Sequence, residues 1–274
     1  MKNNQTAEFP VLPHGIYDSH VHLTDDAFEE NLEEVIARAK ENGIIGVIVP
    51  GDSIASSRAA IRLAEQYPDY IRAAVGIHPY DTRYYCDQIE KELIALSQNP
   101  YCVAIGEIGL DFRKDESDPS PPEVQREAFQ SQMILTKKLG LPVIIHCRNA
   151  YSELISVVSG DEYKEIRGVV HCFSGTRDEA LKLVESGWHI GFTGTLTFKN
   201  APKIREAASA IPLERILVET DAPYLTPHPF RGRFPNEPVY VSYVALELAK
   251  CRQTSMEEVC RKTKENTKRL FNIK

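Results

Sequence analysis

Short apolar runs alternate with longer amphipathic segments along most of this chain. The runs are rich in Val, Ile, Ala and Gly, and they predict eight strands, at residues 15–20, 43–49, 72–76, 102–107, 142–146, 168–171, 188–192 and 215–219. Most of them are nearly continuous in apolar residues and do not alternate with polar ones. That pattern is typical of strands that are buried on both faces of a sheet.

The segments between the runs carry apolar residues at helical spacing. They predict helices at residues 25–42, 53–67, 122–139, 177–186, 239–251 and 255–271. In the first of these, Phe28, Leu32, Val35 and Ala39 recur at helical spacing, and Gly43 suits the C-terminal end of a helix. Strands that recur roughly every 20–40 residues with helices between them are typical of βα units.

Eight βα units over 274 residues predict an α/β protein with one domain, a closed (β/α)8 TIM barrel. The alternative is an open doubly wound sheet, but the GxGxxG turn expected after its first strand is missing from the sequence. We therefore expect residues 14–274 to form the barrel. The polar residues 1–13 are expected to form a flexible leader.

Composition narrows the class of protein further. Hydrophobic residues make up 42% and charged residues 26%, which is ordinary for a soluble globular protein and excludes long disorder. No apolar run approaches the roughly 18 residues that span a bilayer, and the N-terminus lacks the apolar core of a secretory signal. We expect a cytoplasmic protein with no membrane contact. None of the six cysteines has CxxC spacing, which argues against zinc ribbons and thioredoxin-like chemistry.

The formal net charge of −7 bears on nucleic-acid binding. It argues against a protein that holds DNA by a broad basic surface, because such binding depends on many Lys and Arg contacts to phosphate. It does not exclude a compact site in which bound metal neutralises phosphate.

Histidines and carboxylates gather where the predicted strands end. In a barrel, the C-terminal ends of all strands share one face, so side chains far apart in sequence converge there. A buried cluster of this kind is unfavourable when it is left unpaired, and a divalent metal would resolve this. These histidines and carboxylates are His20, His22, His78, Glu107, Asp111, His146, His171, Glu219 and Asp221, and Arg148 lies beside them.

The spacing of two histidines supports a metal site. His20 and His22 lie two apart in an extended segment, so their side chains point to the same side and can chelate one ion. Glu107 and Asp221 supply carboxylates that balance the charge of an ion or bridge two ions. Imidazole with carboxylate suits zinc, manganese, nickel or iron, and carboxylate-rich sites also take magnesium. His14 and His189 lie away from strand ends and are interpreted as structural or surface residues.

Six motifs in order, DSHVHL, GIHP, GEIGLD, HCR, HCFSG and ETDAP, resemble those of the TatD family of metal-dependent deoxyribonucleases, which have amidohydrolase-like barrels. The resemblance runs from about Ile16 to Phe271. Residues 231–238, RGRFPNEP, are similar to the family's RGxxNEP segment but are one residue longer.

The resemblance implies two divalent ions per chain, magnesium in the family, with zinc, manganese or nickel also compatible with the ligands. It implies that one ion is held by His20, His22, Glu107 and Asp221. The second is then held by Glu107, His146 and His171, so that Glu107 bridges the two ions. It also implies a nuclease that acts on DNA, with 3′–5′ exonuclease action on single strands or strand ends.

On this reading the reaction is two-metal hydrolysis of a phosphodiester. Asp221 would orient or deprotonate the attacking water, besides binding metal. His78 would face the substrate phosphate, and Arg148 would clamp it through two hydrogen bonds or else form a salt bridge at the barrel rim. Asp111 and Glu219 would orient the metal ligands.

Single-strand binding usually adds aromatic stacking and a basic rim. The aromatic candidates beside the motifs are Phe112, Phe173, Tyr224, Tyr80, Tyr84 and Tyr85, and the basic candidates are Arg113, Lys114, Lys199, Arg231 and Arg233. Two other functions remain open: a metal-dependent amide, lactone or ester hydrolase on the same barrel, and a non-catalytic DNA-binding protein that retains metal for stability. We expect a monomer with no obligate protein partner.

Overall fold

The computed structural model describes residues 9–113 and 120–274, and these residues contain one eight-stranded parallel sheet. Each strand pairs with the next one in chain order. The strands are β1 (Ile16–Asp18), β2 (Ile44–Pro50), β3 (Ile71–Val75), β4 (Cys102–Asp111), β5 (Val143–Arg148), β6 (Gly168–Val170), β7 (His189–Phe192) and β8 (Ile216–Val218). The predicted single-domain (β/α)8 barrel is confirmed.

The barrel closes where the first and last strands end. The backbone N–H of Ser19 donates to the carbonyl of Val218 over 3.1 Å, and that of Asp221 donates to the carbonyl of His20 over 2.9 Å. These bonds join the segments that follow β1 and β8. The first and last βα units are thereby held side by side, although about 200 residues of sequence separate them.

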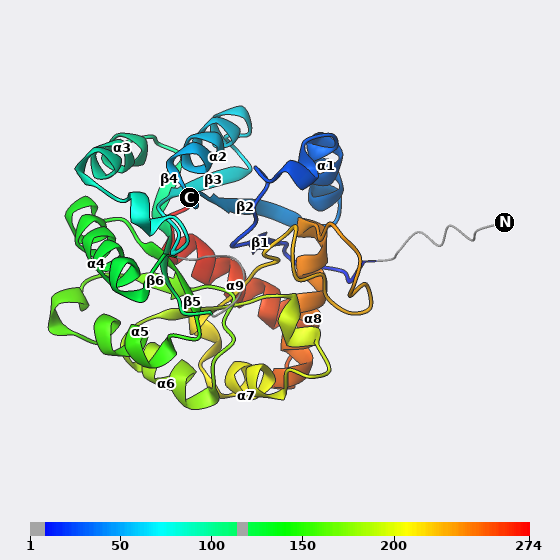
Figure 1. The fold of residues 1–274 in the computed structure, drawn as a ribbon. Helices are drawn as coiled ribbons and strands as arrows, with labels where there is room; N and C mark the ends of the chain where they lie inside the picture. The colour runs from blue at the N-terminus through cyan, green and yellow to red at the C-terminus, as the bar shows by residue number, and fades with distance from the viewer. Residues whose placement is uncertain (1–8, 114–119) are drawn as a thin grey trace.

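Helices surround the strands (Figure 1). They are α1 (Leu32–Glu41), α2 (Ile54–Gln66), α3 (Asp87–Ser97), α4 (Pro122–Leu139), α5 (Tyr151–Val158), α6 (Arg177–Glu185), α7 (Pro202–Ala210), α8 (Val241–Arg252) and α9 (Met256–Leu270). Local sequence explains several ends: Ser53 and Thr176 cap α2 and α6 through reciprocal hydrogen bonds, and Gly140 adopts a left-handed conformation after α4.

Two expectations about elements were wrong. The predicted helix at residues 25–42 is a short 3-10 turn (Asp26–Phe28) followed by α1, because the Asp25 side chain accepts from the N–H of Ala27 and starts a separate turn. The fourth strand does not end at Glu107 but continues to Asp111, paired with β5 as far as Arg148. Glu107 and Asp111 are therefore polar residues inside a buried strand.

The core has two parts. The larger part lies between the strands and the helices, and the smaller one is formed by inward residues of six strands such as Ile48, Ile144 and Leu217. Leu270, Phe271 and Ile273 from the C-terminus pack into this smaller cluster. The end of the chain therefore helps to fill the barrel.

The predicted leader is described only in part, since residues 1–8 lie outside the described residues. The ring of Phe9 contacts the rings of Tyr240 and Tyr243, and Leu12 is buried in the core. Within residues 9–113 and 120–274, no helix combines the length and hydropathy needed to cross a bilayer.

Candidate metal centre

The six side chains predicted to bind metal converge where the strands end. A cavity of about 690 Å³ opens there, and five of the six line it: His22, Glu107, His146, His171 and Asp221. The sixth, His20, is fully buried and touches the others. These residues come from β4, β5 and the segments that follow β1, β6 and β8, as the barrel topology predicts.

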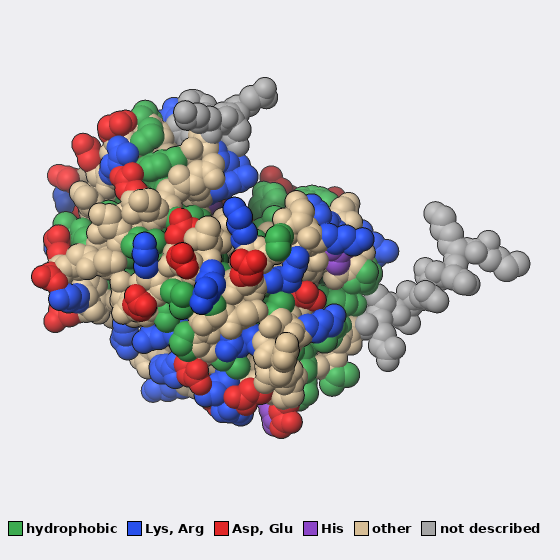
Figure 2. Space-filling view, turned by 90° about the horizontal axis from the view of Figure 1, so that it is seen from below, with side chains coloured by type: hydrophobic (Ala, Val, Ile, Leu, Met, Phe, Trp, Pro, Cys, Tyr) green, Lys and Arg blue, Asp and Glu red, His purple; other side chains and the backbone are tan. Residues whose placement is uncertain are grey.

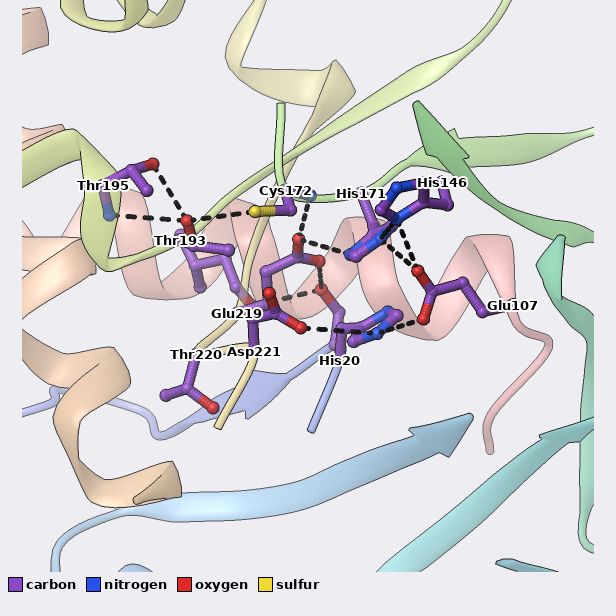
Figure 3. Close-up of polar contacts among 12 residues, drawn as sticks. His20, Glu107, His146, His171, Cys172, Thr193, Thr195, Glu219, Thr220 and Asp221 are labelled. Atoms are coloured by element: carbon purple, nitrogen blue, oxygen red, sulfur yellow. Dashed lines mark hydrogen bonds and ion pairs between the residues drawn. The ribbon is translucent and has the colours of Figure 1, made fainter. Parts of the chain in front are cut away.

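The two oxygens of Glu107 face different histidines (Figure 3). Its Oε1 lies 2.7 Å from Nε2 of His171 and 2.8 Å from Nδ1 of His146. Its Oε2 lies 3.2 Å from Nε2 of His20 and 3.8 Å from Nε2 of His22. One carboxylate thus joins two sets of imidazoles.

Asp221 completes the set around the two closely spaced histidines. Nε2 of His20 and Nε2 of His22 lie 3.2 Å apart, and Oδ1 of Asp221 is 3.7 Å and 3.4 Å from them. The rings of His20 and His171 stack at 3.9 Å with an interplanar angle of 9°. The two sets of ligands are therefore in direct contact.

This donor arrangement fits bound cations. Three groups of ligand atoms each lie within 4.8 Å of one another: His20, Glu107 and His171; His20, His22 and Asp221; and His78, Glu107 and His146. Imidazole nitrogens that converge at 3.2 Å cannot both carry hydrogens without repelling each other. A divalent cation satisfies converging nitrogens and carboxylate oxygens together.

The charges of the cluster suit a cation as well. Burial would raise the pKa of Glu107, but His171 and His20 outweigh it and hold that pKa well below the usual value. Burial would also raise the pKa of Asp221. The hydrogen bond to His22 and the nearby His171 outweigh this effect and hold the pKa below its usual value. Both carboxylates are therefore ionised at neutral pH, as metal ligands must be.

Asp111 orients His146. Nε2 of His146 lies 3.0 Å from Oδ2 of Asp111, which is fully buried. Asp111 also accepts from the guanidinium of Arg113, and its backbone N–H donates to the Gln125 side chain. With Nε2 engaged in this way, Nδ1 of His146 is the nitrogen that faces Glu107 and the cavity.

Glu219 supports His171 from the side opposite to Glu107. It is fully buried, and its Oε1 lies 3.7 Å from Nδ1 of His171 and accepts from the N–H of Cys172 over 2.5 Å. Its Oε2 accepts from the Ser19 hydroxyl over 3.0 Å. A β-carbon at Gly191 would come within 2.8 Å of this carboxylate, so the glycine leaves room for it.

His78 contacts two of the proposed metal ligands directly. Its Nε2 is 3.6 Å from Oε1 of Glu107, and its ring meets that of His146 edge-on at 4.5 Å. Burial and the neighbouring His146 lower the pKa of His78 to about 3, so the ring is neutral at physiological pH. It also lines the cavity and can therefore reach a substrate.

Arg148 is exposed and lines the cavity. Its side chain forms no ion pair with any residue in the described ranges, so the rim salt bridge considered from the sequence is not present there. Among the other candidates, Phe173 is fully buried and is unavailable for stacking, whereas Tyr80 and Tyr224 line the cavity. Lys114 lies outside the described residues.

Asp18 was missed by the sequence interpretation. It is fully buried, and its carboxylate accepts from the backbone N–H and the hydroxyl of Thr220, over 2.9 Å and 2.5 Å, and from the N–H of His20. It therefore ties the segment of His20 to the segment of Asp221. The alternation that aligns His20 with His22 extends back to Asp18, and this signal could have identified it.

Comparison with known proteins agrees with this geometry. The family profile described as TatD related DNase matches residues 17–272. The chain is 40% identical to the "uncharacterized metal-dependent hydrolase YabD" of Bacillus subtilis, over 94% of this chain and 99% of that protein. It is 37% identical to the "3′-5′ ssDNA/RNA exonuclease TatD" of Erwinia tasmaniensis, over 94% of this chain and 100% of that one.

A solved structure shares this fold over nearly the whole chain. The crystal structure of YJJV, a TatD homologue from Escherichia coli, superimposes with a TM-score of 0.87 and 32% sequence identity. The match covers 94% of this chain and 98% of that one. The likeness therefore extends over the barrel as a whole and is not confined to the ligand motifs.

Proposed function

Because this chain belongs to the family of TatD related DNases, which are metal-dependent hydrolases, we propose that it is a 3′–5′ exonuclease that hydrolyses the phosphodiester bonds of single-stranded DNA. The position of Glu107 carries the proposal: its two oxygens face two different sets of histidines within one cavity. That arrangement suits a carboxylate that bridges two cations, and paired cations are the common device for phosphodiester hydrolysis.

The proposed ligand sets follow the contacts of Glu107. His20, His22, Glu107 and Asp221 would hold one ion, and Glu107, His146 and His171 would hold the other. When bound, divalent cations lower the pKa of water and neutralise the charge that develops on the phosphoryl oxygens. Magnesium is the first candidate, and zinc, manganese and nickel also suit these ligands.

The protein's own groups have separate proposed roles. Asp221 lines the cavity as an ionised carboxylate and accepts the proton of the attacking water, whose oxygen bonds to phosphorus as the P–O3′ bond breaks. The leaving O3′ keeps the electron pair of that bond and takes up a proton from solvent. His78 faces the substrate as a neutral ring, and Arg148 binds a non-bridging phosphate oxygen from the exposed side of the cavity. Asp111 and Glu219 keep His146 and His171 in fixed orientations.

The proposed preference for single strands and for a 3′ end is inferred from similar proteins. Several proteins that are 34–37% identical to this chain are named 3′-5′ ssDNA/RNA exonucleases. We therefore propose single strands as substrate and a 3′ end as the starting point, with RNA as a second substrate to be tested. A cytoplasmic, monomeric enzyme without an obligate partner remains part of the proposal.

The test uses chelator-stripped protein and a single-stranded oligonucleotide labelled at its 5′ end. We expect no cleavage without metal and, with an added divalent metal, a ladder that shortens by one nucleotide at a time. An oligonucleotide with a blocked 3′ end should resist. The matched control is Glu107→Gln, which should give no ladder while keeping the circular dichroism of the barrel.

Two results would contradict the proposal. Full activity of Glu107→Gln would remove Glu107 from the mechanism. Turnover of lactone, amide or ester substrates with no cleavage of any oligonucleotide would favour the alternative hydrolase activity on this barrel.

A further inference from the structure

Two exposed aromatic rings contact each other, and one of them lines the cavity. Tyr224 is 52% exposed and Phe234 is 67% exposed, and their ring centroids are 6.4 Å apart. Among the large exposed apolar side chains of the described ranges, these are the two whose rings contact each other. Tyr224 lines the cavity, and its backbone N–H donates to the carbonyl of Asp221. The pair therefore begins three residues beyond a proposed metal ligand.

The segment that carries Phe234 is fixed in place by a buried amide. Asn236 is fully buried, and its Nδ2 donates to the carbonyls of Thr220 and Tyr224 over 3.1 Å and 2.5 Å. Its backbone N–H donates to the carbonyl of Pro223 over 2.8 Å. The two rings are thus held on segments that are hydrogen-bonded to each other, so that little conformational freedom is lost when a ligand contacts them.

Two arginines accompany the rings. Arg231 and Arg233 are exposed on the same segment, and their guanidinium groups lie over the rings of Phe198 and Phe230, at 4.0 Å and 4.8 Å from the centroids. Neither forms an ion pair with a carboxylate of the described residues. Their positive charge is therefore available to an anionic ligand.

The chain carries a net charge of −7, and Figure 2 shows basic and acidic side chains interspersed over one face. Exposed rings together with arginines that form no ion pair are the features that single-strand binding proteins use for bases and phosphates. A polypeptide ligand would not require the arginines, and a duplex would hide its bases from the rings.

We propose that Tyr224 and Phe234 form a stacking platform for the nucleobases of single-stranded DNA next to the scissile bond, with Arg231 and Arg233 binding neighbouring phosphates. The inference rests on the proposed function and adds the residues that select a single strand. Loss of one base–ring contact should weaken binding about 5- to 150-fold.

The test measures binding, so it does not depend on cleavage. Metal-loaded protein is titrated with two labelled oligonucleotides of equal length, one with bases and one with abasic sites in its four 3′-terminal positions. Phosphorothioate linkages suppress hydrolysis in both. We expect wild type to bind the base-bearing strand at least about 5-fold more tightly than the abasic strand.

The variants separate stacking from charge. Phe234→Ala and Tyr224→Ala should reduce this preference towards unity, whereas Phe234→Tyr should retain it. Arg231→Ala should weaken binding of both strands alike and make it less dependent on salt. The matched control is Ile134→Ala, which removes an exposed apolar side chain of α4 that does not line the cavity. Thermal unfolding of each variant checks the fold.

A preference that persists in both alanine variants would overturn the platform, and so would its absence in wild type. A preference that Phe234→Tyr fails to retain would also count against stacking. These outcomes concern binding, so they can be told apart from a failure of the proposed nuclease activity. A base preference without cleavage under any metal would contradict the nuclease activity alone.

Discussion

Nε2 of His146 lies 3.0 Å from the buried carboxylate of Asp111, and Nδ1 of the same ring lies 2.8 Å from Glu107. The ring is therefore held between two carboxylates that use different nitrogens. Nε2 is held by Asp111, and Nδ1 remains able to bind a metal ion or a proton. His171 also lies between two carboxylates, but its Nδ1 is 3.7 Å from Glu219, beyond hydrogen-bond distance, whereas its Nε2 is 2.7 Å from Glu107.

Replacement of Asp111 should weaken metal binding without unfolding the barrel. We expect Asp111→Asn to lower metal affinity about 10- to 100-fold, because the amide orients the ring of His146 less strongly than a carboxylate does. Calorimetric titration of chelator-stripped protein with a divalent metal measures this. Asp161→Asn, at an exposed position, is the control and should bind metal as wild type does. Equal affinities in all three proteins would contradict the role of Asp111.

Asp18 should contribute to stability through its bonds across the barrel closure. Asp18→Ala removes three hydrogen bonds and leaves the buried N–H groups of His20 and Thr220 without an acceptor. We expect the free energy of unfolding to fall by about 3 kcal/mol in urea. Asp18→Asn keeps one acceptor oxygen and should lose clearly less. If both variants unfolded like wild type, the link between β1 and β8 would not matter for stability.

His189 should make the protein less stable in acid. Burial, with Arg215 nearby, lowers the pKa of His189 to about 4, whereas the unfolded chain has the ordinary value of about 6.5. The unfolded state therefore takes up a proton first as the pH falls. The contribution of neutral His189 to stability is complete above pH 6.5 and is lost as the pH falls towards 4, by about 3 kcal/mol.

Urea unfolding at several pH values between 7.5 and 4 tests this expectation. His189→Leu should have a flatter dependence on pH than wild type over that range. Ile134→Ala, an exposed substitution on α4, should have the same dependence as wild type. Parallel curves for wild type and His189→Leu would show that this ring does not titrate as inferred.

Arg148 should affect substrate binding more than the chemical step. We expect Arg148→Ala to raise KM for oligonucleotides and to reduce the salt dependence of binding by about 0.7 in log–log slope, since one phosphate contact is lost. Arg148→Lys should restore the salt dependence but only part of the KM, because lysine cannot make the two-pronged contact. Arg167→Ala, an exposed arginine that does not line the cavity, should change neither quantity. A change confined to kcat would contradict a role in substrate binding and would indicate that Arg148 acts in the chemical step.

Much of the fold was predictable from local pattern. Strands buried on both faces form apolar runs, and all eight were predicted within a few residues of their positions. The helices α3, α5 and α7 were missed. They are short, with 11, 8 and 9 residues, and they offer few repeats of the helical period. Only packing against the strands identifies such helices, because isolated helices of this length are marginal.

The sequence by itself predicted that the six proposed metal ligands would meet. Their positions near the C-terminal ends of strands and the βα repeat allow this, because a parallel barrel brings all strand C-terminal ends to one face, although Glu107 lies four residues before the end of β4. Only the tertiary structure decided which atoms face one another: Nδ1 of His146 and not Nε2, and Oε1 of Glu107 towards His146 and His171 with Oε2 towards His20. It also revealed Asp18 with Thr220, and Tyr224 with Phe234. Such pairs depend on contacts between residues far apart in the chain or on separate loops, and local periodicity carries no information about them.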